Sequence, residues 1–219
     1  MLTAEQVRKQ IETIISDLIS SSLSVDQTFP SLRQTHSEIK VDFGKSDISV
    51  ALRNKPYKEI YDELVQAKSF SFKLIDGAVV QLMYQFNDDS LVKHRLAFFP
   101  SPYLEEYQKN PEVYESDEIY ADIVRRDIVP FPVRFDFDLD ENVVVDVDHP
   151  KSHLTLGQYL NCRIPVSAPV SPYYFIRFIL QNFYNTAFCK FQDQLSSFDV
   201  SFERTITENE QRMVFIEVP

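Results

Sequence analysis

The sequence predicts an α+β fold, in which a largely antiparallel sheet carries helices packed mainly on one face. Apolar residues recur at helical spacing near the N-terminus, residues 69–99 alternate like consecutive strands, and a strongly apolar helix follows Ser171 and Pro172. With 219 residues, of which 44% are hydrophobic, the chain has enough apolar surface for one substantial core. We therefore expect a single domain over residues 1–219.

The first expected element is an amphipathic helix over residues 4–20. Its apolar positions, which include Val7, Ile11 and Leu18, are spaced three or four residues apart. Thr3 and Gln6 have the spacing of a capping box, in which each side chain bonds to the backbone of the other residue. The apolar face needs a partner surface, so the helix joins the core or packs on the domain as an appendage.

The middle of the chain predicts strands with a second helix between them. The expected strands span residues 39–43, 48–52, 70–75, 79–86 and 91–99. Asp76 and Gly77 form a tight turn that begins an antiparallel meander. Helices are expected at 57–67 and, on the surface, within 103–127.

The C-terminal part begins with a helix and ends with a hairpin. Ser171 is an expected N-cap, and Pro172 suits the first position of a helix that continues to about residue 188. Residues 200–206 and 213–218 are expected to pair as the last two strands.

Charge and glycine content exclude several classes of function. The formal net charge is -11, which disfavours extended nucleic acid and anionic membranes, although a local basic pocket could accept short RNA or a nucleotide. The chain has 3 glycines, too few for Walker-type or Rossmann-type phosphate loops, and we expect no cofactor.

The compartment expected from the sequence is the cytoplasm. Residues 1–23 carry acidic side chains within their apolar pattern, unlike a secretion signal, and no apolar run approaches the roughly 20 residues of a membrane span. Cys162 and Cys189 have no C-x-x-C partner, so both are expected to be reduced.

The most informative stretch runs from Val133 to Arg163. Alternation places Arg134, Asp136 and Asp138 on one strand face and apolar residues on the other. A three-residue turn at 140–142 would pair this strand with residues 143–148, which would bring Asp136 opposite Asp146 and Arg134 opposite Asp148. In the strand at 91–99, alternation sends either His94 or Arg95 to the same sheet face.

His149 and His153 follow this strand pair directly. With Arg134 and Arg163 as phosphate clamps and Asp136 orienting an imidazole, they are the residue types of a metal-independent phosphodiester-cleaving site. A weaker alternative is a divalent metal site built from Asp136, Asp138, Asp146 and His149. A structural network of paired charges and a polar binding surface without chemistry are further alternatives.

The segments Arg134–Asp138, His149–Gly157 and Cys162–Pro165, together with Ser171 and Pro172 before an aromatic helix, resemble a family catalogued as domain of unknown function 2290. The resemblance implies a bacterial, intracellular, single-domain protein. It implies no activity. For a small bacterial family of this kind, we also expect a place in a phage-defence or similar accessory system, although no residue of the sequence indicates it.

Two functional expectations follow. The first is an interaction or sensing component, with a protein partner and without membrane association, that recognises a partner or ligand through the polar sheet face. The alternative is a metal-independent phosphodiesterase or ribonuclease that uses the two histidines and the arginine clamps.

Overall fold

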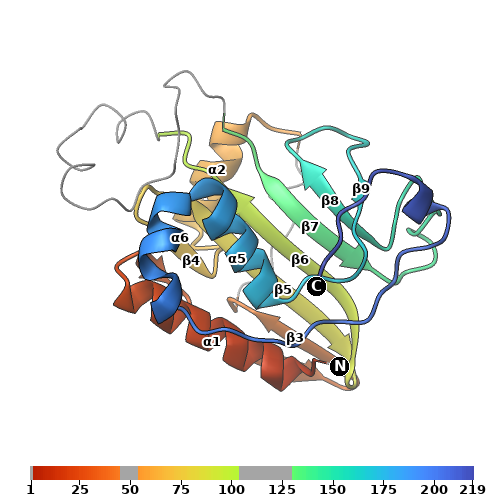
Figure 1. The fold of residues 1–219 in the computed structure, drawn as a ribbon, viewed down its shortest axis with the longest axis horizontal. Coiled ribbons are helices and arrows are strands. Elements are labelled where there is room, and N and C mark those ends of the chain that lie inside the picture. The colour runs from red at the N-terminus through yellow and green to blue at the C-terminus, as the bar shows by residue number, and fades with distance from the viewer. Residues whose placement is uncertain (1, 45–53, 104–129) are drawn as a thin grey trace.

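The computed structural model describes residues 2–44, 54–103 and 130–219 of the chain. Within these ranges, nine strands form one antiparallel sheet (Figure 1). The strands are β1 (Ser24–Gln27), β2 (Ser31–Thr35), β3 (Glu38–Asp42), β4 (Phe72–Leu74), β5 (Val79–Asn87), β6 (Ser90–Phe99), β7 (Val133–Asp138), β8 (Ser152–Leu156) and β9 (Ile164–Pro165). The predicted strand at 48–52 and the predicted helices within 103–127, apart from Tyr103, lie outside the described residues.

The sheet order is β1-β4-β5-β6-β7-β8-β9, and the β2–β3 hairpin pairs with β5 through β3. The meander of β4, β5 and β6 confirms the predicted antiparallel strands around the turn at Asp76 and Gly77. Strand β7 is therefore flanked by β6 on one side and by β8 on the other.

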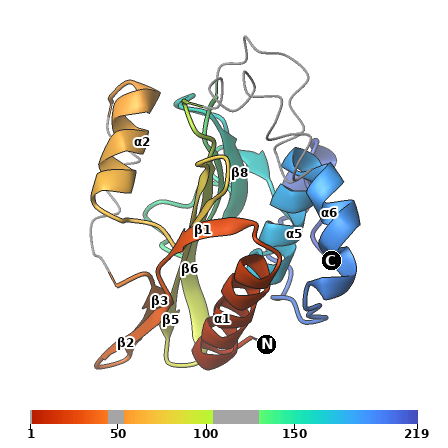
Figure 2. The ribbon, with the colours of Figure 1, turned by 90° about the vertical axis from the view of Figure 1, so that its left-hand side faces the viewer.

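Helices cover the two faces of the sheet unequally. Helices α1 (Ala4–Ser20), α5 (Pro172–Phe183) and α6 (Asn185–Phe191) lie on one face, and α2 (Tyr57–Gln66) lies on the other (Figure 2). Short 3-10 turns, η2 (Gln192–Gln194) and η3 (Glu210–Arg212), complete the described elements. The architecture confirms the predicted α+β class.

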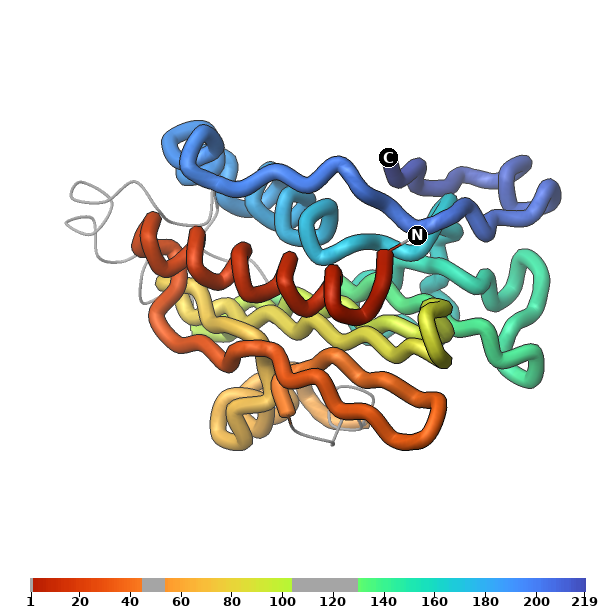
Figure 3. Tube along the Cα trace, turned by 90° about the horizontal axis from the view of Figure 1, so that it is seen from below, coloured from red at the N-terminus to blue at the C-terminus, as the bar shows by residue number. Residues whose placement is uncertain are grey.

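Helix α1 begins at the predicted capping box. The Gln6 amide donates to the Thr3 hydroxyl oxygen, and the Thr3 amide donates to the Gln6 side-chain oxygen. The apolar positions of the helix, except the exposed Ile19, are buried in the main core, and the helix contacts α5, beside which it runs along the sheet (Figure 3). Helix α1 is thus an integral part of the core.

The α5 face of the sheet holds the main core. Phe135 of β7 makes edge-to-face contacts with Phe175 and Phe178 of α5, with ring centroids 5.9 and 5.3 Å apart. The predicted cap is present, because the Tyr174 amide donates to the Ser171 hydroxyl oxygen. These contacts fix β7 with its apolar side chains toward α5.

The predicted helix from 172 to 188 is interrupted at Tyr184. This residue has a non-helical backbone (φ -138, ψ 45), and its hydroxyl donates to the buried Asp76 carboxylate at 2.7 Å. Burial raises the pKa of Asp76, and the hydrogen bond from Tyr184 offsets part of that rise. The break between α5 and α6 therefore lies at Tyr184, the residue whose hydroxyl donates to this buried carboxylate.

The predicted C-terminal hairpin is wrong. Within the described part, the amides of Thr205 and Ile206 bond to the Ser167 carbonyl, and Ile216 forms a parallel bridge with Val166. Both segments thus bond through their backbones to residues 165–167, and the side chains of Arg204 and Glu217 form an ion pair in place of a strand ladder. Among the described helices, none is long and apolar enough to cross a lipid bilayer.

Candidate functional site

Strand β7 separates an apolar face from a polar face, as the sequence predicts. Its buried side chains alternate with partly exposed ones from Val133 to Asp138. The apolar side chains face α5, so Arg134, Asp136 and Asp138 lie on the opposite face of the sheet. This is the face on which α2 packs, because Ala97 of β6, directly opposite Arg134, belongs to the core cluster of α2.

The neighbours of β7 differ from the predicted hairpin. Asp136 lies opposite Arg95 on β6 and His153 on β8, and Arg134 lies opposite Thr155 on β8. The predicted pairings of Asp136 with Asp146 and of Arg134 with Asp148 are wrong. Residues 140–150 instead form turns closed by a bridge between Val145 and His149.

Asp146 lies outside the polar cluster. Its two carboxylate oxygens accept hydrogen bonds from Thr207 and Asn209, both at 2.6 Å, and these bonds lower its pKa. In the described ranges, no group of three or more His, Cys, Asp or Glu side chains is arranged to hold a metal ion. The predicted metal set of Asp136, Asp138, Asp146 and His149 is therefore not assembled.

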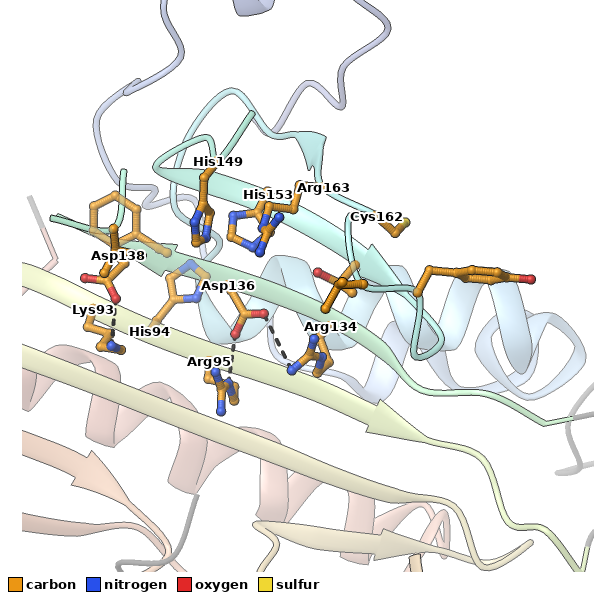
Figure 4. A pocket seen from close by; sticks show the side chains of 15 residues that line it. Lys93, His94, Arg95, Arg134, Asp136, Asp138, His149, His153, Cys162 and Arg163 are labelled. Carbon is orange, nitrogen blue, oxygen red and sulfur yellow. Dashed lines mark hydrogen bonds and ion pairs between the residues drawn. The ribbon is translucent and has the colours of Figure 1, made fainter. Parts of the chain in front are cut away.

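The remaining predicted side chains line one pocket of about 290 Å³ (Figure 4). Its charged lining consists of the cations Lys93, Arg95, Arg134 and Arg163 and the carboxylates Asp136 and Asp138. Two carboxylates offset only half of these cations, so the lining has an excess of two positive charges. In a chain with a net charge of -11, this concentration of positive charge is a local feature that favours an anionic guest.

The carboxylates are already engaged with cations. Lys93 Nζ lies 2.6 Å from Asp138 and Arg95 Nε lies 2.8 Å from Asp136, whereas Arg134 Nη1 approaches Asp136 only to 4.0 Å. Burial raises the pKa of Asp136, but the guanidiniums of Arg95 and Arg134 outweigh it and hold that pKa below its ordinary value. Asp136 is therefore a fixed negative charge between two arginines.

Two guanidinium nitrogens in this pocket have no hydrogen-bond partner. The Nη1 atoms of Arg95 and Arg134 are buried and lack an acceptor within the described part of the chain. Burial also lowers the pKa of Arg134. A buried donor without an acceptor is costly, and guanidinium groups such as these bind phosphate through charge-assisted hydrogen bonds.

His149 and His153 lie beside each other at this pocket. Their ring centroids are 5.0 Å apart in a T-shaped arrangement, and the view in Figure 4 places both above Asp136. His153 is buried, and its Nδ1 donates to the Pro150 carbonyl oxygen at 2.9 Å. Nδ1 therefore carries the proton, which leaves Nε2 of the neutral ring as an acceptor.

Burial is the main cause that lowers the pKa of both histidines, and the nearby Arg163 lowers them further. Asp136 opposes this effect at His153 but does not outweigh it. The prediction that Asp136 orients an imidazole is wrong in this geometry, because the Pro150 carbonyl holds His153 and Asp136 bonds to Arg95. Both rings are neutral near pH 7 in the free protein.

The loop that carries His149 contains a strained residue. Val147 has φ 72, in the left-handed region that a β-branched side chain rarely adopts. Asp146, the preceding residue, is held by Thr207 and Asn209. The C-terminal segment thus anchors the loop in the conformation that positions His149.

His94 takes the core face of β6, and Arg95 takes the polar face. The His94 Nε2 accepts a hydrogen bond from the Val170 amide at 3.0 Å. Its ring is fully buried, and this burial lowers its pKa to about 3. Alternation alone predicts that one of the two residues joins the polar face but does not identify which.

Several pocket residues are not singled out by the sequence pattern. Lys93 and Arg95 join because β6, and not residues 143–148, is the neighbour of β7. Tyr159 and Leu160 line the mouth from the turn after β8. In the sequence, the feature that points to this turn is Gly157, with which the turn begins and which has φ 64.

The arrangement could support acid-base chemistry on a phosphodiester. Nε2 of His153 could take the proton of an attacking hydroxyl, whose oxygen would form a new bond to phosphorus. The bond from phosphorus to the leaving oxygen would break, and a protonated His149 would donate a proton to that oxygen. Arg134 and Arg163 would stabilise the charge on the non-bridging oxygens.

Comparison with known proteins identifies a family and nothing closer. Residues 23–218 match a family model, DUF2290, which is described as an uncharacterized conserved protein. No curated protein and no solved structure matches the chain.

Proposed function

We propose that this chain, which belongs to the DUF2290 family of uncharacterized conserved proteins, is a sensing or interaction component. In this proposal the chain binds a small phosphorylated ligand in the polar pocket. The observation that carries the proposal is the excess of two positive charges in the pocket lining, where Arg95 and Arg134 share the single carboxylate of Asp136. The cytoplasm is the compartment that we propose, and two free cysteines support it.

Phosphate is the anion that best fits this lining. Arg163 adds a further cation from the opposite side of the pocket to Arg95 (Figure 4), and its charge contributes to the lowered pKa of Arg134. Guanidinium groups bind phosphate through paired, charge-assisted hydrogen bonds. The pocket volume of about 290 Å³ is at the lower end of the range for small-ligand sites.

The test is a titration of the purified chain with inorganic phosphate, followed by calorimetry and by the melting temperature. We expect binding that weakens with added salt, and a loss of about tenfold or more in affinity for Arg134→Met and for Arg163→Met. Arg204→Met is the matched control, because Arg204 is exposed and pairs with Glu217. Absence of phosphate binding at millimolar concentration in the unaltered chain would overturn the proposal.

A second candidate function is metal-independent phosphodiester cleavage. The hydrogen bond from His153 Nδ1 to the Pro150 carbonyl favours it, because this bond fixes the tautomer that a general base needs. Bound phosphate would supply negative charge that raises the pKa of His149 toward the protonated form of an acid.

Incubation with a short single-stranded RNA in the presence of EDTA tests this second function. Product with a 2′,3′-cyclic phosphate is expected from the unaltered chain, and turnover should fall at least about 100-fold in His149→Asn and in His153→Asn. His36→Asn is the control, since His36 is exposed and asparagine tolerates its φ of 52. Equal activity in the double histidine variant would exclude this function.

A further inference from the structure

We propose that Tyr159 is a stacking platform for a nucleobase, so that the phosphorylated ligand of the pocket is a nucleoside phosphate. This inference rests on the proposed function and specifies its ligand class. Tyr159 and Leu160 line the pocket, and they are 77% and 88% exposed. Two adjacent large apolar side chains that remain open to solvent at the mouth of a polar pocket are typical of a binding surface.

The turn that carries Tyr159 is anchored at several points. The Gly157 amide donates to the Pro132 carbonyl at 2.7 Å, and the Gln158 side chain donates to the Lys55 carbonyl at 2.9 Å. At the far end of the turn, the Leu156 amide donates to the Cys162 sulfur at 3.4 Å. The exposed ring is therefore presented by an anchored backbone.

The Tyr159 ring lies against Gly157. A Cβ atom built on Gly157 would lie 3.6 Å from Cδ2 of the ring, in ordinary van der Waals contact. The ring thus lies near the backbone at Gly157 and is largely open to solvent. This arrangement leaves ring surface accessible to a flat guest.

A nucleoside phosphate matches both parts of the pocket. Its phosphate carries the negative charge that Arg134 and Arg163 can bind, and its base has an aromatic face that can stack on Tyr159. Stacking of one base on an aromatic side chain contributes about 1–3 kcal/mol. A pocket of about 290 Å³ suits a single nucleotide, either free or at the end of a single strand.

The experiment compares three probes: inorganic phosphate, ribose 5-phosphate and adenosine 5′-monophosphate. We expect the nucleotide to bind about 5-fold to 150-fold more tightly than ribose 5-phosphate, which is the range that stacking of one base would give. Tyr159→Ala should abolish this advantage and leave the affinity for inorganic phosphate unchanged. Tyr159→Phe should retain the advantage because the ring remains.

The control variant is Phe29→Ala, which removes an aromatic side chain that is 52% exposed and does not line the pocket. Equal affinity for the nucleotide and ribose 5-phosphate, or an undiminished preference in Tyr159→Ala, would overturn the inference while phosphate binding still supports the proposed function. If none of the three probes binds, the proposed function fails, and this inference fails with it.

Discussion

Asp136 of β7 lies directly opposite His153 of β8, yet the two side chains have different hydrogen-bond partners. His153 donates to the Pro150 carbonyl, and Asp136 accepts from Arg95. The carboxylate therefore acts on the imidazole only through its charge, which raises the pKa of His153 against the larger effect of burial. Asp136 mainly neutralises the arginines of the pocket.

Replacement of that carboxylate should destabilise the protein. Asp136→Asn would leave Arg95 and Arg134, whose side chains are 15% and 13% exposed, without their shared counter-charge. We expect a loss of up to about 3–5 kcal/mol in the free energy of unfolding, measured with urea. Asp146→Asn, which changes an exposed carboxylate outside the pocket, should cost much less.

The same variant should be rescued by phosphate. If the anion occupies the pocket beside these arginines, it supplies the charge that Asp136→Asn removes, and phosphate should raise the melting temperature of the variant by more than that of the unaltered chain. An equal shift in both proteins would contradict this placement of the anion.

Anion binding should strengthen as the pH falls. The pKa values of His149 and His153 are lowered, so these rings gain a proton only below their ordinary pKa of 6.5. A bound anion favours the protonated rings, and affinity must then rise on acidification. Sulfate is the probe because it remains a dianion throughout this range. We expect a gain on the order of tenfold by calorimetry, and no gain in the double variant His149→Asn, His153→Asn.

Burial of His94 should make the protein sensitive to acid. Its pKa is lowered to about 3, whereas the unfolded chain has the ordinary value of 6.5. Between these values the unfolded state binds a proton that the folded state does not, so stability falls as the pH drops from 6.5 toward 3. The contribution to the slope is at most about 1.4 kcal/mol per pH unit.

Urea unfolding at a series of pH values checks the role of His94. His94→Gln keeps an acceptor for the Val170 amide but does not titrate, so the variant should show a shallower loss of stability over this range. Parallel curves for the two proteins would show that another group controls the acid sensitivity.

Relief of strain at Val147 should stabilise the loop. A left-handed backbone costs a residue with a Cβ about 1–2 kcal/mol, and glycine adopts it freely. Val147→Gly is expected to leave the free energy of unfolding unchanged or to raise it by about 1 kcal/mol. The relief of backbone strain stabilises the folded state, but glycine also makes the unfolded chain more flexible, which cancels part of that stabilisation. Val145→Gly, at a bridged position in the same loop, should lower it. Equal losses in both variants would refute the assignment of strain.

The sequence alone predicted the elements in which the pattern is local. The capping box at Thr3 and Gln6, the helix at 57–67 and the strands around Asp76 and Gly77 are all confirmed, because side-chain periodicity and turn residues act over a few positions. The same locality explains the correct prediction that Arg134 and Asp136 share the polar face of β7.

Only the tertiary structure decided which segments lie beside one another. The alternation of apolar and polar residues in β7 fits two arrangements equally well: a hairpin over residues 133–148 and the observed pairing with β6 and β8. The sequence pattern therefore cannot distinguish them. That choice brought Arg95 and His153 to Asp136 and sent Asp146 to Thr207. Pairing depends on how β7 packs against α5 and on contacts distant in sequence, which a local pattern does not encode.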